Sequence, residues 1–245
     1  MRNLCLFAAL ALVALAVPAA AQDISISLGD GDSLTGRGIQ LILLITVLSL
    51  APGLAIMLTC FPFIVTVLAI LRQAIGLQQS PPNMLIVSLA LFLTYFVMEP
   101  TFTQAWQNGV IPLADEVISI EDAIPRILDP FRDFMAARAK PDTFDALTSL
   151  RPQADAAIPM ADASLSILVP SFMLSEIERA FEIGFLIFLP FLIIDLVVAA
   201  VLMSMGMMMV PPAVVSMPFK LAFFVVADGW SLVSEALVRG YFPQG

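Results

Sequence analysis

Residues 183–228 read IGFLIFLPFLIIDLVVAAVLMSMGMMMVPPAVVSMPFKLAFFVVAD and contain two long apolar segments around a short turn. The segments are Ile183–Val210 and Ala213–Val238. A helix needs about 20 apolar residues to cross a bilayer, and each segment is longer than that. Because Pro211 and Pro212 lie between them, the pattern predicts a helical hairpin whose turn lies at these prolines.

Ionisable residues interrupt these segments, among them Asp195 in the first, and Lys220 and Asp228 in the second. Such groups are unfavourable at membrane depth unless they face a partner or water. In a hairpin centred near Met208, Asp195 and Lys220 lie 13 and 12 residues from the centre, so they should meet at one height, roughly 18–20 Å from it. Lys220 and Asp228 are two helical turns apart, which favours a contact between neighbouring subunits over a direct one. We expect ion pairs that hold helices or subunits together; the alternative is a proton relay.

The turn is rich in methionine, a flexible side chain that conforms to irregular surfaces. Met207, Met208 and Met209 are consecutive, and they cannot all face one side of a helix that repeats every 3.6 residues. The pattern therefore predicts a loop that projects apolar side chains. Repeated around a ring of copies, it would form a deformable gasket; the alternative is adaptable filling of a core. A single chain of this kind cannot enclose a pore.

Residues 39–98 form a similar unit, a first hydrophobic helical hairpin. Ile39–Leu71 has no charge and contains Pro52 and Pro62, so we expect a kinked or broken helix there. A polar turn that includes Pro81 and Pro82 separates it from a second apolar segment. The two halves are either related hairpins or share only the common preference for proline at helix starts.

The first 38 residues read as targeting and linking sequence. Residues 1–21 combine a basic start, an apolar stretch and small residues before the expected cleavage after Ala21, which is typical of a signal peptide. Residues 22–38 are rich in Gly, Ser and Asp and predict a flexible periplasmic segment that leads into the first hairpin. Cys5 would leave with the signal, so the mature chain would keep Cys60 alone and no intrachain disulfide.

Residues 99–182 separate the two hairpins and differ from both in composition. They hold 14 acidic and 6 basic residues and include amphipathic stretches. We expect a small acidic α-helical insert. With the mature N-terminus outside the cytoplasm, two crossings place this insert on the periplasmic side, which does not conflict with the positive-inside bias.

Composition excludes several classes of protein. Of the 245 residues, 60% are hydrophobic and 13% are charged, the net charge is −9 and the mean hydropathy is +0.98, which is unlike a soluble globule and unlike a nucleic-acid-binding chain. There is no histidine, which excludes histidine triads and imidazole-ligated zinc. Nucleotide-binding loops and nucleophile elbows are also missing, so we expect neither an enzyme nor a cofactor or metal site.

Several stretches resemble the FliP family of type III export gate components. They are 170–176 (PSFMLSE), 180–191 (AFEIGFLIFLPF), Ile194-Asp195, 205–212 (MGMMMVPP), 218–221 (PFKL), 228–230 (DGW), 71–74 (LRQA) and 81–83 (PPN). The resemblance covers about 40–100 and 165–242, and the insert adds almost nothing to it.

The resemblance implies an all-α, membrane-associated protein whose proline-broken helices assemble into a helical ring. It implies five copies in complex with FliQ and FliR, beside FlhA and FlhB, in the bacterial inner membrane and on its periplasmic side, within the flagellar basal body. Unfolded flagellar proteins would pass through this channel, and Met207, Met208 and Met209 would seal its entrance. The signal peptide and the long insert resemble flagellar rather than virulence members.

One stretch departs from the family pattern: Thr59-Cys60-Phe61-Pro62-Phe63 lacks a basic residue, which puts a charge contact there in doubt. A different class of function also stays open. In that alternative, the chain is an ion- or proton-conducting membrane subunit whose titrating group is Asp195.

Overall fold

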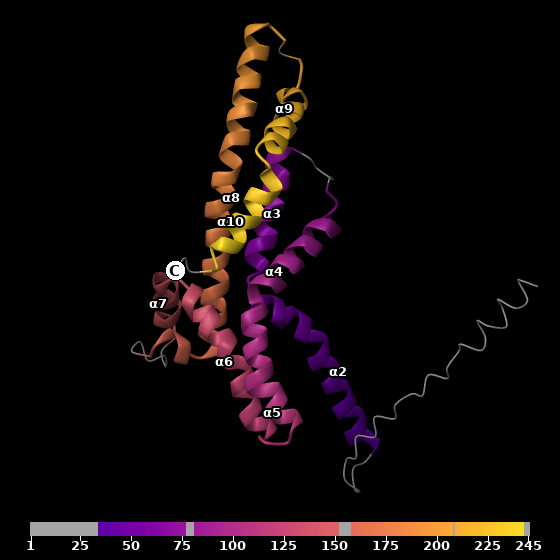
Figure 1. The fold of residues 1–245 in the computed structure, drawn as a ribbon, viewed down its shortest axis with the longest axis vertical. Helices are drawn as coiled ribbons and strands as arrows, with labels where there is room; N and C mark the ends of the chain where they lie inside the picture. The colour runs from indigo at the N-terminus through magenta and orange to yellow at the C-terminus, as the bar shows by residue number, and fades with distance from the viewer. Residues whose placement is uncertain (1–33, 77–80, 152–157, 208, 243–245) are drawn as a thin grey trace, which may run out of the picture. The chain divides into compact units, whose positions relative to one another are not determined.

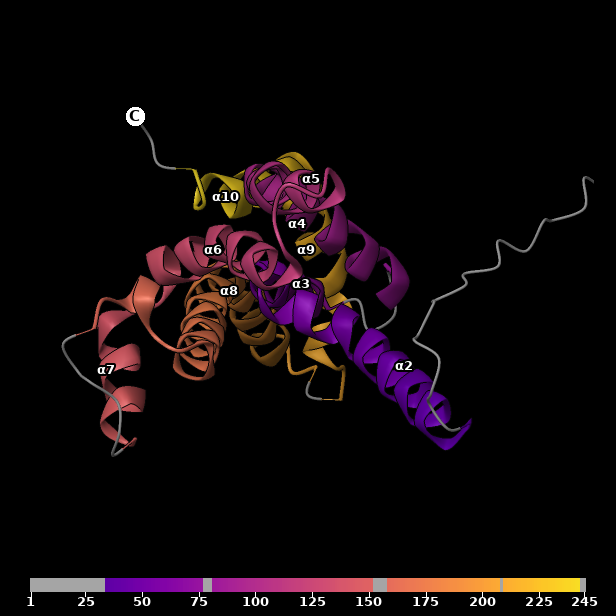
Figure 2. The same ribbon diagram turned by 90° about the horizontal axis from the view of Figure 1, so that it is seen from below.

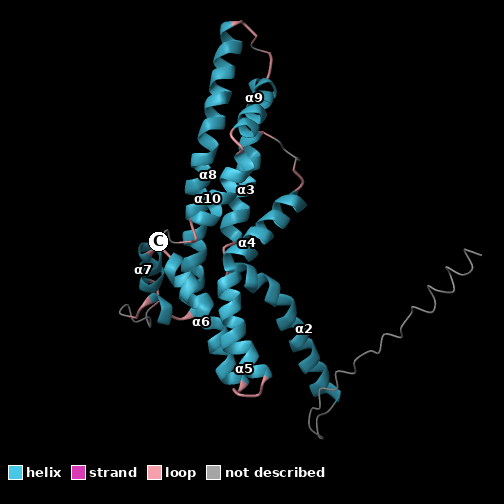
Figure 3. Cartoon of the chain, in the orientation of Figure 1, coloured by secondary structure: helices cyan, strands magenta, loops and turns pink. Residues whose placement is uncertain are grey.

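The computed structural model describes residues 34–76, 81–151, 158–207 and 209–242 of the chain. Within these ranges all regular structure is helical (Figure 3), so the prediction of an all-α fold is confirmed. The elements in chain order are α2 (Leu34–Met57), α3 (Phe61–Ile75), α4 (Asn83–Ala105), the π-helix η1 (Trp106–Val110), α5 (Ile111–Ala114), α6 (Ile120–Arg138), α7 (Pro141–Ser149), the 3₁₀ turn η2 (Met160–Asp162), α8 (Leu165–Ser204), α9 (Pro212–Val226) and α10 (Gly229–Arg239).

The chain divides into two compact units, residues 1–49 and 50–245. The expected signal peptide, 1–21, and nearly all of the expected flexible segment lie outside the described residues. The described part of the first unit is the beginning of α2. All further description concerns the second unit.

Helix α3 forms the centre of the core, and it packs mainly against α8 (Figures 1 and 2). Its inward face follows the spacing of an amphipathic helix: Phe63, Ile64, Val67, Leu68, Leu71, Ala74 and Ile75 are all buried. Gly184 of α8 lies against Ile70 of α3, because a Cβ at that position would come within 2.4 Å of Ile70 Cδ1. The lack of a side chain at residue 184 therefore favours the close approach of α8 to α3.

The prolines act differently from one helix to the next. The break expected in Ile39–Leu71 occurs at residues 58–60, and Pro62 then occupies the first turn of α3, where a missing N–H has no effect. Pro52 lies inside α2. Helix α8 runs without interruption for 40 residues and contains both Pro170 and Pro190.

The acidic insert shares its helices with the apolar part of the chain. The expected boundaries at 98/99 and 182/183 fall inside α4 and α8, which continue across them. Helix α6 is fixed by Arg132, whose Nη1 donates to the carbonyls of Ala161 (3.2 Å) and Ala163 (2.7 Å). Its Met135 packs with Leu168 and Phe172 of α8 in a second apolar cluster.

Among the residues that the structure describes, two helical stretches are long and apolar enough to cross a membrane, Asn83–Ala114 and Leu165–Ser204. The number rises to four if each of two bent helix pairs counts as one span. Much of the apolar surface of these stretches is exposed, including Phe92 on α4 and Phe185 and Leu196 on α8. Exposed apolar area of this extent indicates contact with lipid or with other protein chains.

Candidate functional site at the α8–α9 hairpin

Helices α8 and α9 form a hairpin whose tip begins with a defined C-terminal cap. Gly206 adopts a left-handed conformation with φ of 74°, and its N–H donates to Met203 O. The N–H of Met207 reaches back to Leu202 O at 3.0 Å, which completes a Schellman motif. The chain then turns, with Val210 N donating to Met207 O, and Pro211 caps the start of α9 at Pro212.

The methionines at this tip are strongly exposed where the structure describes them. Met209 is 97% exposed, and Met205 and Met207 are also exposed, whereas Met208 lies outside the described residues. Burial of the apolar surface of a methionine side chain is favourable, and an exposed methionine does not gain this free energy. Contact between the tip and another surface would therefore stabilise the tip.

An apolar groove of about 580 Å³ lies just below the tip, between α8 and α9. Met207 extends from the tip into the lining of this groove. The remaining lining residues are Ile193, Ile194, Val197, Val198, Val201, Leu202, Met205, Val215 and Phe219.

The structure brings Asp195 and Lys220 together deeper in the hairpin. Lys220 Nζ lies 2.6 Å from Asp195 Oδ2 and donates also to Ala74 O of α3 at 3.0 Å. Ser216 Oγ donates to the other carboxylate oxygen, Oδ1, at 2.6 Å. The Lys220 side chain is 7% exposed and that of Asp195 is 33% exposed. One buried ammonium thus connects α8, α9 and α3, and each charge has a partner, as burial requires.

Asp228 lies apart from this pair. It is exposed, precedes α10 in a left-handed conformation with φ of 48°, and forms no ion pair with any side chain that the structure describes. The next residue, Gly229, lies against the Phe224 ring, where a Cβ would come within 2.1 Å of Cε2. These two residues make the bend of 62° between α9 and α10.

The turn of the first half is tied to α3 by Arg72. Its Nη1 donates to Pro81 O at 3.4 Å and to the side chain of Asn83. Pro82 precedes α4, so this proline pair, like Pro211 and Pro212, stands at the start of a helix.

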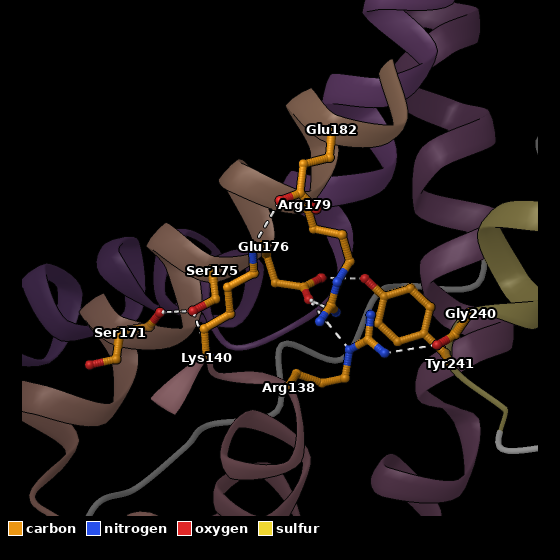
Figure 4. A network of polar contacts seen from close by, with 9 residues as sticks. All are labelled: Arg138, Lys140, Ser171, Ser175, Glu176, Arg179, Glu182, Gly240 and Tyr241. Carbon is orange, nitrogen blue, oxygen red and sulfur yellow. Dashed lines mark hydrogen bonds and ion pairs between the residues drawn. The ribbon is translucent and has the colours of Figure 1, made fainter. Parts of the chain in front are cut away.

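The sequence analysis does not predict the polar cluster around Glu176, which Figure 4 shows. Glu176 of α8 is fully buried, and its carboxylate faces Arg179 at 3.0 Å, Arg138 of α6 at 3.4 Å and the hydroxyl of Tyr241. Burial raises the pKa of Tyr241 above its ordinary value, and the Glu176 carboxylate raises it further, so the phenol stays a hydrogen-bond donor. The sequence gives no distinct signal for the cluster, because Glu176 is followed closely by Glu178, Arg179 and Glu182, and its partners Arg138 and Tyr241 are far away along the chain.

The fold and this hairpin define a class of protein: an all-helical, membrane-associated chain with exposed apolar faces and a methionine-rich tip. In the described part of the chain, no three side chains of the metal-binding types lie close enough to hold a metal ion. The exposed apolar faces of the hairpin are surfaces suited to assembly.

Comparison with known proteins identifies the family. The FliP family profile matches residues 44–237. The flagellar biosynthetic protein FliP of Caulobacter vibrioides is 49% identical over 247 residues, which cover 98% of this chain and 92% of that protein. The proteins of the same name are 50% identical in Rhizobium meliloti, over 81% of each chain, and 44% identical in Bacillus subtilis, over 83% of this chain and 91% of that one.

The chain therefore belongs to the FliP family. It is a membrane component of flagellar biosynthesis and protein export, and it is not an enzyme.

Proposed function

We propose that the chain is a core subunit of the flagellar protein export channel, in which the α8–α9 tips of several copies meet and seal the pore. The exposed methionines carry this proposal, because Met209 is 97% exposed in the single chain and gains stability only when a further surface covers it. Identical tips around an axis would supply that surface and stay deformable, since methionine has an unbranched side chain.

The exposed apolar face of α8 supports assembly of several copies. Phe181, Phe185 and Leu196 are each at least 60% exposed. A single chain of helical hairpins is too small to surround a polypeptide. We propose a pentameric ring with FliQ and FliR, next to FlhA and FlhB, on the basis of the family resemblance. Its place would be the inner membrane and the periplasmic side of the basal body, after cleavage of the signal peptide, with the acidic insert in the periplasm.

In the proposed channel Asp195, Lys220 and Asp228 have structural roles. Lys220 and Ser216 already satisfy both oxygens of Asp195, which makes the carboxylate a packing element rather than an exchanging proton site. Asp228 is exposed and is available to a neighbouring subunit. The Pro81-Pro82 and Pro211-Pro212 pairs set the two hairpin turns.

The proposal is tested by measuring ion leakage across the membrane of vesicles that contain the assembled complex. Replacement of Met207, Met208 and Met209 by Ala together should raise small-ion leakage, because alanine cannot fill the axis, while some protein export continues. The matched control is Met84→Ala, which truncates an exposed methionine of α4 far from the tip along the chain. Leakage equal to that of the unaltered complex would count against the seal. If Asp195→Asn instead abolished ion passage through the complex, this result would support the alternative, an ion-conducting subunit that uses Asp195.

A further inference from the structure

Tyr241, two residues after the end of α10, reaches into the buried polar cluster. Its hydroxyl donates to Oε2 of Glu176 in the first third of α8. Arg138, at the end of α6, donates through Nη1 to Gly240 O at 2.8 Å. Three elements that are distant in sequence therefore converge on one carboxylate, as Figure 4 shows.

Aromatic contacts hold the Tyr241 ring in the same place. The ring stacks on Phe134 at 6.0 Å between centroids and meets the edge of Phe63 at 5.6 Å. The guanidinium of Arg138 lies 4.1 Å from the ring centroid, within the range of a cation–π interaction.

Helix α10 has other attachments along one side: Leu237 lies in the main core, Val233 and Val238 pack against that core, and Trp230 meets the Phe224 ring at 5.3 Å between centroids. Among its residues only Gly229 and Leu237 are buried, and Trp230, Leu232 and Glu235 are exposed. At its other end the chain bends through Asp228 in the left-handed conformation, which aspartate adopts more readily than most residues with a side chain. The helix is thus joined to α9 by a sharp bend and fixed at its far end by Tyr241.

Release of Tyr241 would not leave an isolated charge. Without the Tyr241 hydroxyl, Glu176 would keep its contacts with Arg179, three residues later on the same helix, and with Arg138 of α6. A buried carboxylate that loses all its partners is strongly destabilising, whereas one that keeps two guanidinium groups is not. The cluster can therefore hold Tyr241 and also persist without it.

We propose that Tyr241 is a latch: it fixes the end of α10 to Glu176 of α8 and Arg138 of α6, and its release loosens α10 beyond the bend at Asp228–Gly229 while the rest of the fold stays intact. The latch connects the acidic insert, through Arg138, to the helix that follows the α8–α9 hairpin. It is a conformational device that does not depend on the seal at the hairpin tip.

Hydrogen exchange followed by mass spectrometry on the full-length protein in its assembled complex tests the latch. Tyr241→Phe keeps the ring and removes only the hydroxyl. One hydrogen bond to a charged group is lost, so amide exchange in residues 229–242 should rise about tenfold. Exchange in α3, in α8 around Glu176 and in α9 should not change. Arg138→Gln, which removes the contacts to Gly240 and to the ring, should give the same regional pattern.

Two matched controls belong to the experiment. Tyr95→Phe makes the same change at the exposed tyrosine of α4, and Arg239→Gln removes an exposed ion pair with Glu235 within α10. Neither should alter exchange in residues 229–242. The latch is refuted if Tyr241→Phe leaves this region unchanged, or if it raises exchange evenly in all helices, because even exchange would mean that the cluster only contributes to global stability.

Discussion

Lys220 Nζ lies 2.6 Å from Asp195 Oδ2, so the two charges of the apolar hairpin neutralise each other between α8 and α9. The ammonium also donates to Ala74 O, which fixes the hairpin to α3. The stability of the hairpin should therefore depend on the pair rather than on either charge alone.

Lys220→Met should destabilise the protein by about 3 kcal/mol, because it leaves Asp195 with Ser216 as its only hydrogen-bond donor among the described residues and an unpaired charge. The double variant Asp195→Leu with Lys220→Met should recover most of this loss, since it removes both charges together. Thermal unfolding of the detergent-solubilised protein measures both. A double variant less stable than Lys220→Met would show that the pair is not the source of the effect.

Gly184→Ala should weaken the contact between α8 and α3. The added Cβ would lie 2.4 Å from Ile70 Cδ1, the mobile end of a side chain, so we expect a loss of about 1–3 kcal/mol rather than failure to fold. Ile70→Val in the same chain should restore part of the stability by making room for the methyl group. Gly53→Ala is the control, because nothing lies within 4 Å of a Cβ at that position.

Gly206 should tolerate asparagine better than valine. Its φ of 74° is left-handed, a conformation that asparagine adopts far more readily than a β-branched residue. Gly206→Val should break the cap that positions Met207 and so increase ion leakage through the assembled complex. Gly206→Asn should leave leakage close to that of the unaltered protein. Equal leakage from the two variants would mean that the cap at Gly206 does not contribute to the seal.

The latch should weaken at alkaline pH. The folded protein raises the pKa of Tyr241 above the ordinary value of 10.0, so its hydrogen bond to Glu176 contributes fully below pH 10 and loses its contribution as pH rises further. The stability advantage of the native chain over Tyr241→Phe should fall by about 1.4 kcal/mol per pH unit above 10. Unfolding at several pH values between 8 and 11 measures it. An advantage that stays constant over this range would contradict the assignment.

The sequence predicts much of the hairpin because the information is local. Apolar runs define α8 and α9, and the Pro211-Pro212 pair defines where α9 begins. The equal distance of Asp195 and Lys220 from the turn predicts that they meet, and their side chains do face each other. The all-α class follows from the same runs.

Long-range packing accounts for what the sequence does not predict. Pro190 interrupts no helix, because α8 continues through it, whereas the break before Pro62 falls at residues that carry no strong turn signal. The cluster of Glu176 with Arg138 and Tyr241 joins residues 38 and 65 positions apart, and no periodicity connects them. The bend at Asp228 depends on a contact between side chain and backbone, because the Phe224 ring lies where a side chain at residue 229 would be.

Oxidative cross-linking of Met209→Cys tests most directly whether the α8–α9 tips of several copies meet at one axis. The chain for this measurement carries Cys5→Ala and Cys60→Ala, and the assembled complex is oxidised before denaturing electrophoresis. If the tips meet at one axis, oxidation should give covalent dimers through residue 209. Leu150 is 77% exposed in the insert, and Leu150→Cys should give no such dimers. A Met209→Cys chain that stays monomeric, in particles that still hold several copies, would contradict the proposed seal.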